Sequence, residues 1–219
     1  MLAPPELRLL DEAKVHNVYA AGQVIFYQGN PCLGLHCLES GVVALRKVDE
    51  RGNSVIVRLG HAGDTLGYVA FFAQRLYSTS AECLGECRTC FIDRAALREL
   101  LGRNPALGQR FLGRLAANLE QAEELRLEAA ASPLLARLAQ LLLTLKNRLG
   151  AVADDGTLGI NLPLSRRDLA AMLGARPETI SRAIAQLERR GLAHFTGRRV
   201  TIPDLDALID EAEQVPDCG

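Results

Sequence analysis

The 219-residue sequence lacks an apolar run long enough to cross a membrane or to act as a signal peptide. It also lacks a Walker loop, a His-Glu-x-x-His zinc motif and a nucleophile elbow, and it has no internal repeats or low-complexity tracts. We therefore expect a cytoplasmic protein with no membrane partner, and we do not expect an enzyme.

The sequence also lacks a strong overall charge, because its formal net charge at pH 7 is only −1. The charge is nevertheless divided along the chain. Residues 161–202 carry eight Arg and only three acidic residues, a net charge of +5, which leaves −6 for the remainder. A basic segment of this kind indicates a polyanionic partner. Hydrophobic residues make up 48% of the sequence, which is enough to form the core of one or two domains.

Short β-rich runs separated by glycine-containing turns fill the first part of the chain, from about residue 15 to 93. Asp49-Glu-Arg-Gly-Asn53 has the composition of a hairpin turn between two of these runs. The spacing predicts an antiparallel β-roll with strands at Gln23–Tyr27, Leu35–Glu39, Val42–Val48, Val55–Leu59, Ala81–Leu84 and Thr89–Asp93.

Helical periodicity begins at Ala95, breaks at Asn104-Pro105 and then continues to about Ala131. Apolar residues recur along one stripe of the long helix. The stripe consists of Leu107, Phe111, Leu115, Leu119 and Ala122. It fits either packing against the β-roll or a two-stranded homodimer interface, and periodicity alone favours neither. After Ser132-Pro133 we predict another helix over Leu134–Leu149, a turn at residues 154–156 and a short strand at Ile160–Leu162.

The basic segment has the pattern of a helix-turn-helix. Ser165 and Asp168 form a capping-box pattern that starts a short helix, and Gly174 is suited to end it. Pro177 suits the first position of a second helix, which Gly191 ends. Two short helices joined by a glycine-containing turn are the signature of this motif.

The second helix has one apolar face, formed by Ile180, Ala183, Ile184 and Leu187. The opposite face presents Glu178, Ser181 and Arg182 in its first turns, where recognition helices contact base edges. A solvated Glu178–Arg182 pair is the alternative interpretation. Residues 192–202 then predict a β-hairpin wing. We expect contacts to the DNA backbone from Ser165, Arg166, Arg176, Thr179, Arg198 and Arg199.

With these elements in place, the sequence resembles the CRP/FNR family of bacterial transcription regulators over nearly its whole length. The matching residues are Gln28-Gly29, Ser40-Gly41, Gly63-Asp64-x-x-Gly67, Leu169-Ala-x-Met-Leu-Gly174 and Pro177-Glu-Thr-Ile-Ser-Arg182. The resemblance implies an α+β chain with a cyclic-nucleotide-binding-like β-roll in residues 1–104, a dimerisation helix in residues 105–131 and a winged helix-turn-helix in residues 132–219.

The same resemblance implies a homodimeric regulator whose partners are double-stranded DNA and RNA polymerase. Glu178-x-x-Ser181-Arg182 resembles the FNR branch, whose members read TTGAT half-sites in inverted repeat. The signal would be a redox change, a gas or a small molecule bound in the roll. Cyclic AMP does not fit, because relatives that bind it hold its phosphate with an Arg-Ser-Ala run, whereas Ser78-Thr-Ser-Ala81 has no arginine there.

The cysteines leave several effector hypotheses open. Cys83-x3-Cys87-x2-Cys90 lies on the predicted last hairpin of the roll, Cys90 matches a cluster-binding position of FNR, and Cys32 and Cys37 offer further thiols. An iron–sulfur cluster, a thiol–disulfide switch and inert packing are all compatible with these residues. No cysteine precedes Cys32, unlike in FNR.

Haem is a further candidate cofactor, with axial ligands from His16, His36, Cys37 or the region of Pro4. Two other classes of protein compete with a DNA-binding regulator. One is a β-roll that binds a ligand or metal without acting on DNA, and the other is a cysteine-ligated metalloenzyme.

Overall fold

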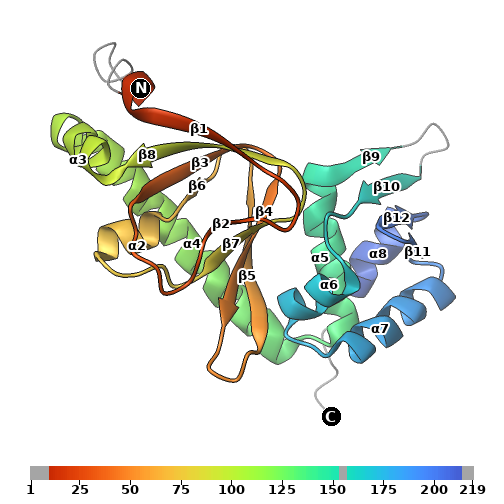
Figure 1. Ribbon diagram of the computed structural model, residues 1–219. Coiled ribbons are helices and arrows are strands. Elements are labelled where there is room, and N and C mark those ends of the chain that lie inside the picture. Colours follow the sequence, from red (N-terminus) through yellow and green to blue (C-terminus); the bar gives the residue numbers. More distant parts are fainter. Residues whose placement is uncertain (1–9, 153–156, 214–219) are drawn as a thin grey trace. The chain divides into compact units, whose positions relative to one another are not determined.

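The computed structural model describes residues 10–152 and 157–213, and its chain divides into two compact units, residues 1–120 and 121–219. The first unit contains an antiparallel β-roll and the second a helical domain with a small sheet (Figure 1). This α+β architecture confirms the predicted fold class. No helix in the described ranges is both long and apolar enough to span a bilayer.

The β-roll consists of two four-stranded antiparallel sheets, with strand orders β1-β8-β3-β6 and β2-β7-β4-β5. Their strands are β1 (Lys14–Tyr19), β2 (Val24–Phe26), β3 (Gly34–Ser40), β4 (Val42–Val48), β5 (Ser54–His61), β6 (Thr65–Leu66), β7 (Ser80–Cys83) and β8 (Cys87–Asp93). Six of these match the strands expected from the sequence. The pattern did not resolve β1 and β6, because β1 has little apolar alternation and β6 is only two residues long.

The predicted hairpin turn between β4 and β5 is present. The Asp49 carboxylate accepts hydrogen bonds from the backbone N–H groups of Arg51 and Asn53 at 2.9 and 2.8 Å. Gly52 has φ 83, a left-handed conformation that glycine adopts without steric cost. The turn residues thus determine where the chain reverses from β4 into β5.

Cysteines 83 and 87 do not lie on one hairpin, which corrects the sequence-based expectation. The turn between them is short, but β7 pairs with β2 and β4 whereas β8 pairs with β1 and β3. The chain therefore crosses from one sheet to the other at this turn. Strand-like patterns locate the strands but do not reveal with which neighbours they pair.

Three helices follow or interrupt the strands of the first unit: α2 (Tyr68–Ala73), α3 (Arg94–Arg103) and α4 (Pro105–Ala131). Asp93 caps α3 by accepting from the N–H groups of Ala95 and Ala96. The break before Pro105 and the end at Ala131 agree with the sequence, whereas α2 was not expected. Helix α4 extends from the first unit into the second, and the three-part domain division remains a prediction.

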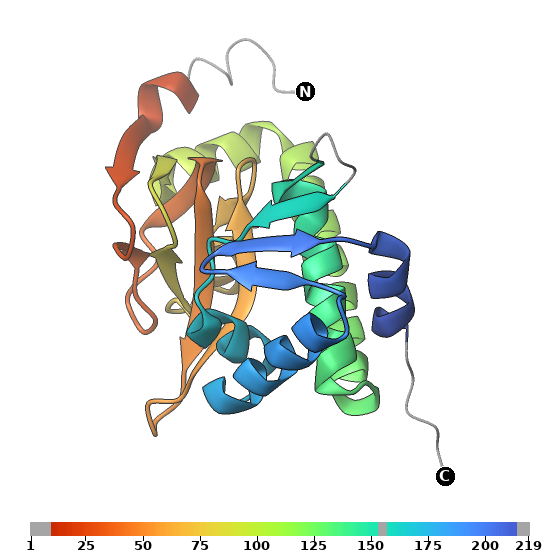
Figure 2. The ribbon, with the colours of Figure 1, turned by 90° about the vertical axis from the view of Figure 1, so that its right-hand side faces the viewer.

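In its described residues, the second unit combines the end of α4 and four further helices with the sheet β11-β12-β10-β9 (Figure 2). Its elements are α5 (Leu134–Leu149), β9 (Gly150–Val152), β10 (Leu158–Asn161), α6 (Arg166–Leu173), α7 (Pro177–Arg189), β11 (His194–Thr196), β12 (Arg199–Ile202) and α8 (Leu205–Ala212). The sequence pattern missed only β9 and α8. The turn predicted at residues 154–156 lies outside the described residues.

Candidate DNA-binding surface and sensor roll

Helices α6 and α7 form the helix-turn-helix expected from the sequence. The Ser165 hydroxyl accepts from the N–H of Asp168 at 3.2 Å, and the Asp168 carboxylate accepts from the N–H of Ser165 at 2.8 Å. Gly174 ends α6 with φ 61. The capping box and the glycine stop therefore set the geometry of the turn that leads into α7.

Helix α7 has the two faces that its periodicity predicts. Ile180, Ala183, Ile184 and Leu187 are all buried. Glu178 and Arg182 are exposed at the beginning of the opposite face, and Ser181 is half-buried between them. The Ser181 hydroxyl donates to the Pro177 carbonyl at 3.0 Å, which leaves its oxygen lone pairs free to accept a hydrogen bond from a base.

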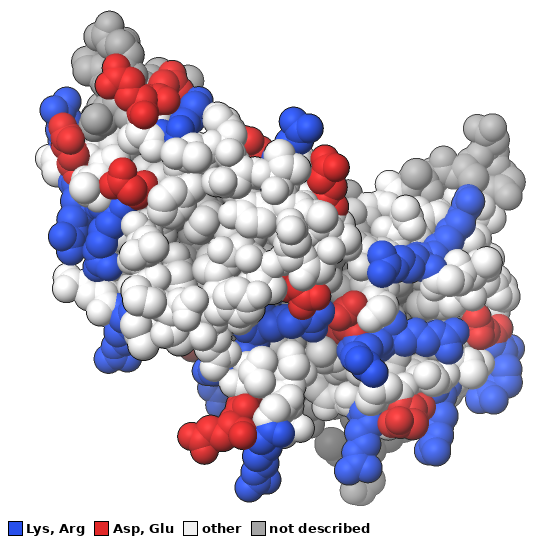
Figure 3. All heavy atoms as spheres, in the orientation of Figure 1, with Lys and Arg blue, Asp and Glu red and all other residues white. Residues whose placement is uncertain are grey.

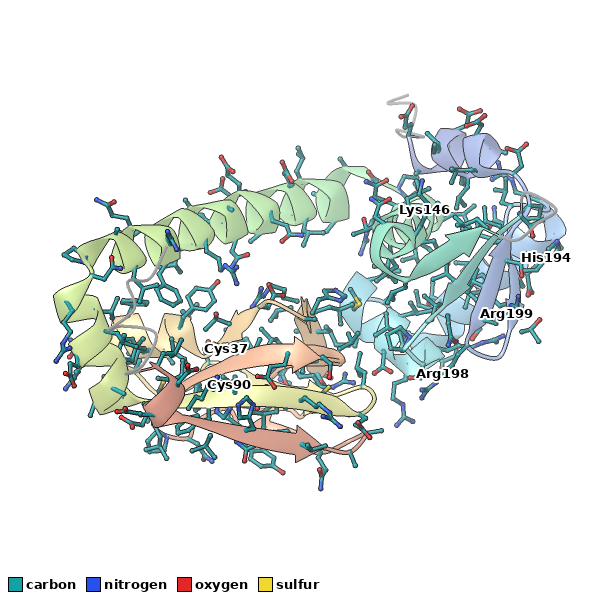
Figure 4. All side chains as sticks on the ribbon, turned by 90° about the horizontal axis from the view of Figure 1, so that it is seen from above. Cys37, Cys90, Lys146, His194, Arg198 and Arg199 are labelled. Atoms are coloured by element: carbon teal, nitrogen blue, oxygen red, sulfur yellow. The ribbon has the colours of Figure 1, made fainter. Side chains whose placement is uncertain are left out.

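The residues expected to contact phosphates differ in their exposure. Arg166, Arg176, Thr179, Arg198 and Arg199 are exposed, whereas Ser165 is half-buried and its hydroxyl is occupied by the capping box. Arg198 and Arg199 project from the turn of the β11–β12 wing (Figure 4). Over α6 and α7, Lys and Arg side chains outnumber Asp and Glu (Figure 3). The net charge of +5 is thus displayed on the surface.

Three side chains that the sequence pattern did not single out position these elements. Arg137 of α5 donates to the Leu173 carbonyl at the end of α6. Arg190, which follows α7, pairs with the buried Glu211 of α8 at 2.6 Å. Glu188 accepts from the backbone N–H of Phe195 in β11 at 3.1 Å. Leu173 is distant from Arg137 in sequence and Glu211 lies in a helix that was not expected, while the contact of Glu188 with Phe195 depends on how the wing folds back on α7, so no local pattern indicated these partners.

The apolar stripe predicted on α4 divides between two environments. Phe111 and Leu115 pack against the core of the roll, and the Phe111 ring lies 5.2 Å from that of Phe72. Leu107 is half-buried, whereas Leu119 and Ala122 are exposed. Leu112, which the stripe did not include, has 65% of its surface exposed and Leu119 has 61%. The helix therefore has apolar residues packed against the β-roll and other apolar residues exposed, which a homodimer interface could use.

Polar contacts also hold the first half of α4 against the roll. Arg114 lies 3.5 Å from the Asp64 carboxylate, which also faces Arg58 at 3.8 Å. Asn118 donates to the hydroxyl of Tyr68, a buried residue in the first turn of α2. Because Phe111, Arg114 and Asn118 succeed one another at intervals of three and four residues, one side of the helix contacts the roll.

The five described cysteines are free thiols, and four of them form two separate neighbourhoods. Cys37 and Cys90 are opposite each other on β3 and β8 (Figure 4). Cys83 and Cys87 lie close together where the chain crosses between the sheets. Since Cys87 and Cys90 are three residues apart on one strand, they face opposite sides of the sheet.

This distribution does not fit an iron–sulfur cluster in the described part of the chain. A cluster needs four thiolates held close together. Cys32 is buried and its thiol donates to the Gly34 carbonyl at 3.4 Å. Within residues 10–152 and 157–213, no three His, Cys, Asp or Glu side chains are arranged to hold a metal ion.

Burial also determines the protonation of several roll residues. Desolvation raises the pKa of Cys37 and of Cys90, and it raises the pKa of Cys83 to about 12, so these thiols are protonated at neutral pH. Desolvation lowers the pKa of His36 to about 4. Low thiolate content is typical of packed cysteines rather than of reactive ones.

Three of the candidate haem ligands lie on one sheet: His16 and Cys37 are in register with Cys90 across β1, β8 and β3, whereas His36, next to Cys37, faces the other side of the sheet. His36 is buried between the rings of Phe26 and Phe91, at centroid distances of 5.7 and 4.8 Å. His16 lies on β1 and its Nδ1 is 3.1 Å from the Glu39 carboxylate. The region of Pro4 lies outside the described residues. Aromatic packing on both sides of His36 does not fit a haem plane at that imidazole.

Comparisons with known proteins agree with this arrangement. Residues 16–104 match the model of the cyclic nucleotide-binding domain, and residues 136–211 match that of the Crp-like helix-turn-helix domain. The nitrogen fixation regulation protein FixK of Azorhizobium caulinodans is 30% identical over 192 residues, covering 87% of this chain and 76% of FixK.

Two further relatives extend the comparison. The transcriptional activator protein FnrL of Cereibacter sphaeroides is 27% identical over 218 residues, covering 98% of this chain and 87% of FnrL. The structure of FixK2 from Bradyrhizobium japonicum superposes with a TM-score of 0.80 at 25% identity, covering 92% of this chain and 98% of FixK2.

Proposed function

Because the chain belongs to the CRP/FNR family of transcription regulators, we propose that it binds an inverted DNA repeat as a homodimer and responds to a signal received by the β-roll. The observation that carries this proposal is the exposed beginning of α7. Glu178, Ser181 and Arg182 face outward there, while the rest of the helix is anchored by four buried side chains.

The chemistry of these three residues suits base reading in the major groove. A guanidinium donates two hydrogen bonds to guanine, and a carboxylate accepts from the cytosine amino group. The Ser181 oxygen accepts from an amino group, since its proton is directed to Pro177. The resemblance of this set to the FNR branch supports a TTGAT-like half-site.

The outward face of α4 supports the homodimer. Leu112, Ala116 and Leu119 are exposed at i, i+4 and i+7, the spacing of a two-helix seam. A dimer axis along this seam would present two copies of α7 to the two halves of an inverted repeat. Exposed leucines at this spacing would otherwise remain in water.

The contacts of α4 with the roll support a route for the signal. Arg114 contacts Asp64 and Asn118 contacts Tyr68. An effector or a redox change that moves Asp64 or Tyr68 would alter these contacts and so shift α4 between two positions. RNA polymerase is the further partner of a regulator that works in this way. Anaerobic absorption spectra with metal analysis distinguish a metal cofactor from a thiol or small-molecule signal.

DNA binding is tested with the purified full-length chain on a duplex carrying an inverted TTGAT repeat. Fluorescence anisotropy should show specific binding that is much tighter than binding to a scrambled duplex of the same length and composition. Equal affinity for both duplexes in reduced, oxidised and anaerobically prepared protein would contradict the proposal.

A further inference from the structure

Glu188 lies in the last turn of α7 and reaches the wing. Its carboxylate accepts a hydrogen bond from the backbone N–H of Phe195 at 3.1 Å. Phe195 is in β11, the edge strand of the sheet β11-β12-β10-β9, and its N–H faces away from β12. The Glu188 carboxylate therefore satisfies a backbone N–H group that would otherwise be unpaired at the open edge of the sheet.

The position of Glu188 on the helix relates this bond to the DNA-binding surface. Glu188 follows Ser181 by seven residues, which places the two residues on the same side of α7, two turns apart. The strand that Glu188 holds leads directly into the turn that presents Arg198 and Arg199. One side chain thus connects the base-reading helix with the phosphate-binding hairpin.

The charge of Glu188 is unfavourable at such a surface. It is one of three acidic residues in the basic segment 161–202, and a carboxylate there weakens attraction to phosphates. A role in geometry and a role as an ordinary surface charge are therefore separated by changing the length of the side chain and its charge independently.

We propose that Glu188 is a positioning residue that fixes the wing to the recognition helix. Through it, Arg198 and Arg199 meet phosphates while Glu178, Ser181 and Arg182 meet base edges. The inference rests on the proposed DNA-binding function. When the hydrogen bond between Glu188 and Phe195 is lost, the contacts of the wing with phosphates should weaken. The discrimination between bases should persist, because the buried side chains of α7 still hold the helix in place.

Two matched variants separate geometry from charge. Glu188→Gln keeps the length and an acceptor oxygen but removes the charge, and Glu188→Asp keeps the charge but shortens the side chain by one methylene group. The readout is the slope of log K against log salt concentration on the inverted-repeat duplex, to which each phosphate contact contributes about 0.9. Thermal unfolding confirms that both variants are folded.

We expect Glu188→Gln to keep the wild-type slope and to bind at least as tightly as wild type. Glu188→Asp should reduce the slope by up to about 2 for each half-site, the value for two lost phosphate contacts. The preference for the specific over the scrambled duplex should change little in either variant. If Glu188→Asp matches wild type and only Glu188→Gln binds more tightly, the carboxylate acts as a charge and the inference is wrong.

A double-mutant cycle provides a second, independent test. Replacing both Arg198 and Arg199 by Ala should reduce the affinity of wild type more than that of the Glu188→Asp variant, since the wing is already displaced in the latter. Additive losses would overturn the inference. If wild type itself shows no specific binding, the proposed function fails instead, so the two failures are distinguishable.

Discussion

Arg190 and Glu211 form an ion pair at 2.6 Å that joins the end of the recognition helix to α8. The two partners differ in exposure, because 42% of the Arg190 side chain is exposed but only 3% of the Glu211 side chain. If the pair is broken, a released arginine can turn into water, whereas a released carboxylate stays buried.

This asymmetry predicts unequal effects of the two substitutions. Arg190→Ala should lower the free energy of unfolding by about 2–3 kcal/mol, because it leaves a buried carboxylate unpaired. Glu211→Gln should cost less. Chemical denaturation monitored by circular dichroism measures both, and Arg189→Ala at the neighbouring exposed position is the control. Equal losses for Arg190→Ala and Arg189→Ala would contradict the role of the pair.

Arg182 is predicted to contact a base. Arg182→Ala should cost about 1–3 kcal/mol of specific binding and relax discrimination at one base pair of each half-site. Arg198→Ala should instead weaken specific and random DNA binding alike, with a lower salt slope. Competition binding with single-base variants of the half-site measures the difference. An equal loss on specific and random DNA for Arg182→Ala would exclude base reading.

The two sides of α4 are predicted to have different roles. Leu119→Glu and Leu112→Glu should dissociate the dimer, since each places a charge in the proposed seam, and should leave the stability of the roll unchanged. Phe111→Ala should lower the stability of the roll by about 2 kcal/mol through lost packing, without dissociating the dimer. Sedimentation equilibrium and thermal unfolding distinguish the two outcomes. A Leu119→Glu variant that remains dimeric would place the interface elsewhere.

The stability of the roll should depend on pH on both sides of neutrality. His36 has its pKa lowered from 6.5 to about 4, so the unfolded chain binds a proton first and stability falls as pH decreases from 6.5 through 4. Cys83 has its pKa raised from 9.0 to about 12, so stability falls as pH increases from 9 towards 12.

Thermal unfolding as a function of pH measures both losses of stability, the acid limb below pH 6.5 and the alkaline limb above pH 9. His36→Leu should flatten the acid limb, and Cys83→Ala should flatten the alkaline limb. Each variant is the control for the other, because the substituted groups titrate in separate ranges. If the acid limb keeps its slope in His36→Leu, other groups cause it.

The thiols should differ in their reactivity towards an alkylating reagent. Cys37 is half-buried, whereas Cys83 and Cys87 are fully buried, and desolvation keeps Cys83 protonated. The sixth cysteine, Cys218, lies outside the described residues and is replaced by serine to keep its labelling out of the comparison. In this Cys218→Ser background, we expect Cys37 to be modified well before the other two. Mass spectrometry of digests after timed labelling measures the order. Modification of Cys83 or Cys87 first, in folded protein, would contradict the packing described.

Local sequence determined much of the DNA-binding half of this protein. The capping box at Ser165, the glycine stop at Gly174 and the apolar period of α7 all act within one or two helical turns, so their residues alone define the helices. The hairpin at Asp49–Asn53 is equally local, since one carboxylate forms its turn. Once the buried face of α7 is known, its exposed face follows from geometry.

Only the tertiary structure decided which side of α4 meets the roll, which cysteines are neighbours and which side chains position α7. Periodicity placed Phe111 and Leu119 on one stripe, but the roll contacts Phe111 and leaves Leu119 exposed. Strand patterns placed Cys83, Cys87 and Cys90 along the chain without showing that β7 and β8 belong to different sheets. Such relationships depend on pairing between distant segments, which no local period encodes.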